Sequence, residues 1–261
     1  MRKYLFFVVV AIAFILSVGT GKGADTAGMS AEAMKHWNNR LDMNSALKSA
    51  EIFEQIAKAD PKDAKIAELA VRSFYWLGIN QKVKEKKQEY HKRGWDLGEL
   101  LMKTQPKNVG VIYWTASNIA RYAQTLGELQ QKTYFTKINP LMEKVIELDQ
   151  NYFYGGGPRY LAIITIEMSP TLRKFAAIMN KKYKFTVEEA IEMCKEAIKI
   201  GNYYFLNHTT LAEAYIEAGK KEEARKELEW VIATDPGKLP ECKPENIFEQ
   251  GRAKEMLKNL K

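Results

Sequence analysis

Apolar residues recur at helical spacing almost everywhere after residue 30, and alternating runs of β-branched residues are missing. Proline and glycine marks divide this pattern into segments, most of them about 11 to 25 residues long, which is the rhythm of paired antiparallel helices. The sequence therefore predicts an all-α fold built from helical hairpins.

The clearest repeat is the segment from His208 to Pro236, in which "LAEAY" is followed by "ARKEL" and a closing proline. This matches the tetratricopeptide pattern, with Ala212 small where the two helices cross and Tyr215 filling the space between repeats. Gly219 suits a left-handed cap at the end of the first helix, and Pro236 stops the second.

The same register returns more weakly along the chain, so we expect a degenerate tetratricopeptide-like solenoid of four or five helical pairs. Segment 171–185 is predicted to be an insertion between the two helices of one repeat. Segment 246–260 is predicted to be a capping helix with a polar outer face. The second helices share an apolar stripe, which comprises Ser49, Phe53 and Ile56; Ala190, Cys194 and Ala197; and Ala224, Leu228 and Val231.

The N-terminus has the pattern of a Sec-type signal peptide, predicted over residues 1–23, with the solenoid over 24–261. Arg2 and Lys3 precede an apolar run from Tyr4 to Val18, and small residues follow. The alternative is an uncleaved N-terminal anchor, which would be the chain's one contact with a membrane. Both interpretations place the body outside the cytoplasm, as a periplasmic or secreted protein.

Charge and cysteine content restrict the partners only mildly. The formal net charge is +8, and the densest basic cluster, Lys82 to Arg93, is interrupted by Glu85 and Glu89. Because such acids pair with lysines on a helix, we interpret the cluster as a solvated face and expect no nucleic-acid partner. Cys194 and Cys242 leave a disulfide open, since the compartment permits one and the sequence does not give its geometry.

The stretch "YFYGGGPRY" contains three glycines and a proline: Gly155, Gly156, Gly157 and Pro158. It lacks the Lys and Ser or Thr of a phosphate loop, and no strand precedes it as a dinucleotide fingerprint requires. One interpretation is a tight interhelical turn that brings backbone close to a neighbour. The other is that exposed amides and Arg159 face a ligand groove.

The block from Glu147 to Pro170, with the C-terminal repeat, resembles the T-component family associated with TRAP transporters and exported tetratricopeptide proteins related to it. The resemblance covers about residues 140–235 and rests on the export signal, the Gly-Gly-Pro turn and the "LAEA" repeat. Ala162 stands where that family usually has Gly, and a lipobox Cys is missing. The resemblance implies a solute-binding protein as partner.

Counting along the first helix of each repeat predicts which side chains face a concave groove. Three arginines and two aromatic residues fall on that face, which suits an acidic peptide tail or a small carboxylate with an apolar body. The alternative is that each arginine pairs with a local acid of the solenoid. The predicted binding residues are Arg72, Tyr75, Trp114, Arg121, Arg159 and Glu213.

No catalytic or metal-binding pattern accompanies the repeats: the three histidines are isolated, no Cys/His pair has metal spacing, and no cofactor is expected. The sequence thus predicts an exported, non-catalytic scaffold that binds a protein partner, either a solute-binding protein or a peptide segment. The alternative is a periplasmic carrier of a small carboxylate-bearing apolar ligand. Homo-oligomerisation is left open.

Overall fold

The computed structural model describes residues 26–260, apart from the side chains of residues 128 and 129, and the regular elements in that range are all helices. The predicted signal peptide lies outside the described residues. Among the described helices, none is long and apolar enough to cross a membrane. The helices are α1 (Thr26–Asn38), α2 (Met43–Ala59), α3 (Ala64–Ile79), α4 (Lys84–Thr104), α5 (Val109–Gln124), α6 (Glu128–Leu148), α7 (Tyr152–Glu167), α8 (Pro170–Met179), α9 (Val187–Ile200), α10 (Phe205–Glu217), α11 (Lys221–Ala233) and α12 (Lys243–Asn259), with short 3-10 turns η1 (Pro236–Lys238) and η2 (Pro240–Cys242).

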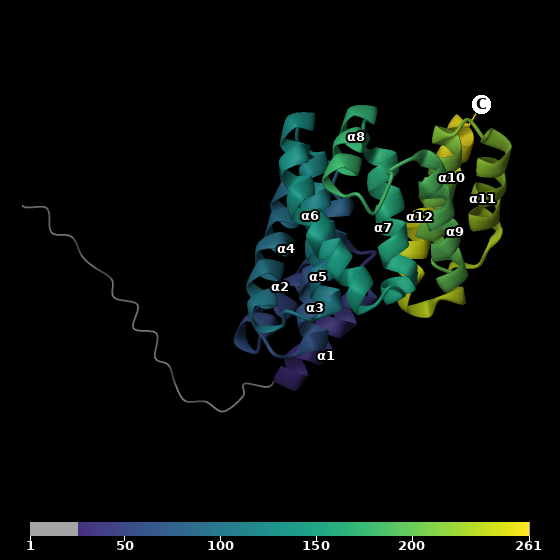
Figure 1. Cartoon of the computed structure of the whole chain (residues 1–261). Coiled ribbons are helices and arrows are strands. Elements are labelled where there is room, and N and C mark those ends of the chain that lie inside the picture. Colours follow the sequence, from purple (N-terminus) through teal and green to yellow (C-terminus); the bar gives the residue numbers. More distant parts are fainter. Residues whose placement is uncertain (1–25, 261) are drawn as a thin grey trace, which may run out of the picture.

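Within the described range, ten helices pair into five stacked hairpins, α1/α2, α3/α4, α5/α6, α7/α9 and α10/α11 (Figure 1). The first helices of successive repeats also touch one another, α3 with α5, α5 with α7 and α7 with α10, so they form the inner layer of the solenoid. This confirms the predicted all-α helical solenoid.

The apolar stripes identified in the sequence form the contacts between hairpins. Phe53, Ala190, Cys194, Ala224 and Leu228 are all 0% exposed. Ala212 is equally buried at the crossing of α10 with its neighbours, and Gly219 takes the left-handed conformation at the end of α10, with φ of 74°. Helical periodicity and cap chemistry therefore placed this part of the fold correctly.

Polar side chains at the starts of helices set the spacing between repeats. Asp63 caps α3 by accepting from the amides of Lys65 and Ile66, and Asn108 caps α5 by accepting from Val111. Asn108 Nδ2 also donates to the carbonyl of Ala64, at 2.9 Å. The cap of one repeat is thus tied to the cap of the preceding one.

Two helices depart from the hairpin order. Helix α8 is inserted between the paired helices α7 and α9, as predicted for segment 171–185. Helix α12 packs on α10 and α11 as a cap would, and its first residues also contact the N-terminal hairpins. Because α12 reaches both ends of the solenoid, it lies along the inner face and is part of the candidate site.

Candidate functional site

The start of α12 is attached to the N-terminal repeats by an ion-pair cluster around Glu245. Its carboxylate accepts from Arg40 at 2.5 Å and from Arg72 at 2.8 Å, and Arg40 is only 2% exposed. Arg40 also donates to the carbonyls of Trp37 and Glu241. Burial alone would raise the pKa of Glu245, but the guanidiniums of Arg72 and Arg40 hold it below its usual value.

The middle of α12 is attached to α10 by a second polar cluster. Glu249 accepts from the hydroxyl of Thr209 at 2.6 Å and from Arg252 at 2.9 Å, and Arg252 also pairs with Glu213. Glu245, Glu249 and Arg252 are spaced i, i+4 and i+7, so one charged face of α12 is directed at the solenoid. The predicted polar outer face is present, since Lys254, Glu255 and Lys258 are exposed, but the helix also has a charged inner face that sequence reasoning did not predict.

Beside α12 the inner face is hollowed into a cleft of about 320 Å³ between α3, α4, α5, α7, α10 and α12. Its size is at the lower end of the range, about 300–1,000 Å³, that is usual for small-molecule sites. Of the predicted binding residues, Tyr75, Arg121 and Glu213 line this cleft. Sequence reasoning missed Lys87 and His91 on α4, which also line it, because they lie in the basic cluster that was interpreted as a solvated face.

His91 is buried in the wall of the cleft, with its ring packed over Gly78. It is 0% exposed, and a Cβ on Gly78 would come within 2.4 Å of the ring. His91 Nδ1 lies 3.0 Å from Asn118 Oδ1, while Asn118 Nδ2 donates to the carbonyls of Val71 and Trp114. Asn118 Oδ1 is therefore an acceptor, Nδ1 carries the proton, and His91 Nε2, which has no partner, is a bare acceptor.

We expect the free energy of unfolding to fall by about 3 kcal/mol as the pH is lowered from 7 to 4, because of His91. Burial is the main cause that lowers the pKa of His91 from 6.5 to about 4; the charges of Arg121 and Lys87 add to it, and the hydrogen bond that Nδ1 donates to Asn118 Oδ1 opposes it. The unfolded chain therefore binds more protons in this window, so stability is complete above pH 6.5 and is lost towards pH 4.

Urea unfolding at stepped pH measures this slope. The variant His91→Gln should remove most of it above pH 4.5, whereas His36→Gln, which changes a partly exposed histidine, should leave it intact. An unchanged slope in His91→Gln would contradict the assignment to His91.

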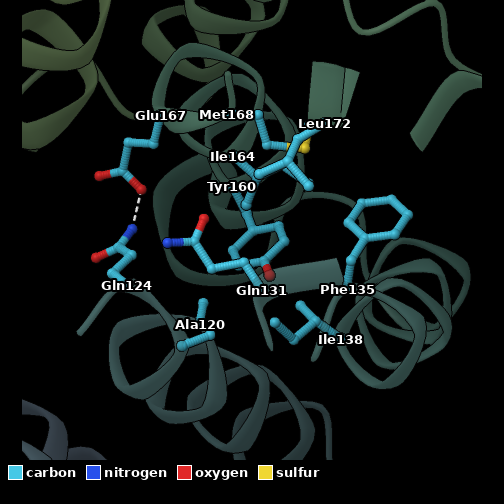
Figure 2. Close-up of a pocket in the computed structure, with 11 residues that line it drawn as sticks. Ala120, Gln124, Gln131, Phe135, Ile138, Tyr160, Ile164, Glu167, Met168 and Leu172 are labelled. Atoms are coloured by element: carbon cyan, nitrogen blue, oxygen red, sulfur yellow. Dashed lines mark hydrogen bonds between the residues drawn. The ribbon is translucent and has the colours of Figure 1, made fainter. Parts of the chain in front are cut away.

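A smaller apolar hollow of about 70 Å³ adjoins the cleft between α5, α6, α7 and α8. Figure 2 shows the ring of Tyr160 at its centre, with Phe135 and Leu172 on one side and the hydrogen-bonded pair of Gln124 and Glu167 on the other. The buried hydroxyl of Tyr160 has no partner within the described chain. Since Gln124 and Glu167 line both spaces, they separate the hollow from the cleft.

The predicted placement of Arg159 on an open groove is wrong, because its side chain is 0% exposed. Arg159 donates to Asn207 Oδ1 at 2.8 Å and to the hydroxyl of Tyr113 at 3.0 Å. It also donates to the carbonyls of Phe153 and Tyr154, both at 3.1 Å. Its guanidinium is therefore an internal support for the turn before α7.

That turn is the glycine stretch, and it is interhelical and buried. Phe153, Tyr154 and Gly155 all have left-handed backbone, and only the last is a glycine. Gly155 to Pro158 are buried, and a Cβ on Gly155 would lie 2.7 Å from the Cα of Ala197. The structure thus favours close backbone approach over an exposed anion loop.

Two further predicted residues are occupied by contacts within the chain. Arg72 pairs with Glu245 and lies 4.5 Å over the ring of Phe153. Trp114 is 4% exposed and donates its indole N–H to Tyr152. Arg121, in the cleft, pairs with Glu167 at 2.9 Å. For Arg72 and Arg121, the alternative of pairing with an acid of the solenoid is therefore what the structure shows.

Cysteine and histidine chemistry adds no second site in the part of the chain that the structure describes. Cys194 and Cys242 are both buried free thiols, and burial raises the pKa of Cys242 to about 11. His208 is satisfied by Glu227 and by the carbonyl of Asn202. Among residues 26–260, no group of three or more His, Cys, Asp or Glu side chains is arranged to hold a metal ion.

Comparison with known proteins identifies a family for this chain. A family model described as regulator of microtubule dynamics protein 1-3 (RMD1-3) matches residues 31–261. The chain belongs to this family. The resemblance to the T-component of TRAP transporters is not confirmed, since the family whose model matches is RMD1-3.

Solved structures similar to this chain include a tetratricopeptide-repeat protein. A thermophilic protein of this class from Thermus thermophilus aligns over 85% of this chain and 99% of its own, at 13% identity, with a TM-score of 0.53. A mutant of MamA aligns over 78% of this chain and 94% of its own, at 18% identity, with a TM-score of 0.40. No curated protein matches the chain. The first likeness supports the fold.

Proposed function

We propose that this protein is an exported, non-catalytic scaffold that binds a protein partner through the concave face of its solenoid. The observation that carries the proposal is that this face already holds a helix of the chain itself. Helix α12 is seated there by Glu245 at one end and by Glu249 and Arg252 further along. The inner face thus has charged and aromatic contacts that fit an acidic helical segment, with an open cleft beside them.

The partner that we propose is a solute-binding protein. The glycine turn and the C-terminal repeat imply it through their resemblance to the T-component family. The description of the RMD1-3 family, regulator of microtubule dynamics, is compatible with binding to a protein, so both lines support an interaction role. Export is supported by the apolar run from Tyr4 to Val18 and by the basic residues before it.

Site-specific photo-crosslinking in the source cells tests the proposal. A photoreactive amino acid at Gln124, which lines the cleft, should give a discrete crosslinked protein. The same amino acid at Glu99, exposed on the outer helix α4, is the control and should give none. Mass spectrometry of the product identifies a solute-binding protein or another partner. Identical products at both positions, or none at Gln124, would refute docking on the concave face.

The second candidate function is a carrier of a small carboxylate with an apolar body. The specific observation in its favour is that an apolar hollow adjoins the charged cleft. Native mass spectrometry of the purified protein separates the two candidates, since a co-purifying metabolite supports the carrier and a co-purifying protein supports the scaffold.

A further inference from the structure

We propose that the end of the cleft between α3, α4 and α5 is a binding site for a small α-hydroxycarboxylate. Lys87 and Arg121 would receive its carboxylate, and His91 Nε2 would accept a hydrogen bond from its hydroxyl. This inference rests on the second candidate function and specifies the chemistry of its ligand.

The free acceptor of His91 requires a hydrogen-bond donor on the ligand. Its Nδ1 is committed as a donor to Asn118, so Nε2 is an acceptor, and it has no partner although the ring is fully buried. An unsatisfied buried acceptor is unfavourable, and a hydroxyl or N–H of a ligand would remove that cost. His91 lines the cleft, so a molecule inside it can supply that group.

The charges of Lys87 and Arg121 favour an anionic group on the ligand. Lys87 is half-buried at the cleft and forms no ion pair with any described residue. Arg121 uses Nη1 for both Glu167 and Gln124 and also interacts with Tyr75, so only part of the five donors of its guanidinium is used. A carboxylate between these two cations would make charge-assisted hydrogen bonds.

The opposite end of the cleft supports this orientation. Its cation, Arg252, already pairs with both Glu213 and Glu249, so it is used within the protein. The other cations that line the cleft are Lys87 and Arg121, so a ligand carboxylate is placed at the end formed by α4 and α5.

The charges of Lys87 and Arg121 also determine which kind of donor the ligand can place at His91. A ligand ammonium at His91 would lie near Lys87 and Arg121, whose charges already disfavour a positive group there. A neutral hydroxyl donates to His91 Nε2 without that repulsion. The combination of anion and neutral donor on adjacent atoms is the α-hydroxycarboxylate pattern.

Isothermal titration calorimetry on the full chain tests the proposal with pairs of acids that differ by one hydroxyl. The probes are malate against succinate and lactate against propionate. We expect the hydroxy acid of at least one pair to bind about tenfold tighter than its deoxy partner, because the deoxy acid leaves His91 Nε2 unpaired.

Lys87→Gln should weaken binding of that hydroxy acid about tenfold. Lys86→Gln is the matched control, since Lys86 is exposed and pairs with Glu89 outside the cleft. Nitrogen NMR of the imidazole gives an independent readout: the His91 Nε2 resonance should move upfield on addition of the hydroxy acid and not of its deoxy partner.

Equal binding within each pair, binding of inorganic phosphate alone, or no binding of either hydroxy acid would overturn the proposal. So would equal losses in Lys87→Gln and Lys86→Gln. A protein crosslinked at Gln124 would leave these outcomes unaffected, so failure here and failure of the scaffold can be told apart.

Discussion

Replacing Arg159 by Met should lower the free energy of unfolding by about 3–5 kcal/mol. The guanidinium is 0% exposed and serves four acceptors, from Tyr113, Phe153, Tyr154 and Asn207. Methionine fills a similar length but donates nothing, so buried oxygens lose their donor. Two of them are carbonyls of the left-handed turn, where non-glycine backbone is strained and depends on such contacts.

Chemical denaturation of the purified protein measures the change. Arg225→Met is the control, since Arg225 is only half-buried and its contacts, with Glu222 at 3.9 Å and with the carbonyl of Leu260 at 3.3 Å, are loose. This control should change stability by no more than about 0.5 kcal/mol. If Arg159→Met were as stable as the control, the guanidinium would not be what supports the turn.

The fold was largely predictable because local patterns determine it. Stripes such as Ala190, Cys194 and Ala197 have helical spacing whatever the rest of the chain does, and all three are buried. Gly219 likewise needs only its own helix end to require left-handed backbone. Stacked hairpins follow from repetition of such local signals.

The candidate site was predicted less well because its contacts join distant segments. Arg72 meets Glu245 across most of the sequence, and Arg159 meets Asn207 from another repeat. Register counting places a side chain on a helix face, but it cannot show that another segment covers that face. His91 was missed because it lies in the basic cluster that was interpreted as a solvated face, whereas its burial is set by Gly78 and Asn118 from neighbouring helices.

One signal for the role of α12 was present in the sequence. Glu245, Glu249 and Arg252 share one face of the helix, and a face with that regular charge pattern needs partners if it is turned inward. The aromatic residue Phe248 lies next to this face and packs edge-on against Trp76, at 6.2 Å between ring centroids. A cap with an aromatic residue beside its charged face is better interpreted as a helix seated in a groove.

Replacing Glu245 by Gln should lower the free energy of unfolding by about 3–5 kcal/mol, since Arg40 and Arg72 would then be left largely buried without their shared counter-charge. The direction of this change in stability agrees with the pH dependence that we expect for the wild type. Because the folded-state pKa of Glu245 lies below its ordinary value, its contribution is present above about pH 4.5 and is lost as the pH falls further.

The variant Glu255→Gln is the control, because Glu255 is exposed on the same helix and should be close to neutral. Hydrogen exchange distinguishes a local from a general effect: in Glu245→Gln, amides at the start of α12 and the end of α1 should exchange faster than those of the α7/α9 hairpin. Uniformly faster exchange, or stability equal to that of Glu255→Gln, would mean that this ion-pair cluster does not hold α12 on the inner face. The scaffold proposal depends on the opposite result, because a face that binds its own helix through Glu245 has the chemistry to bind an acidic helix from a partner.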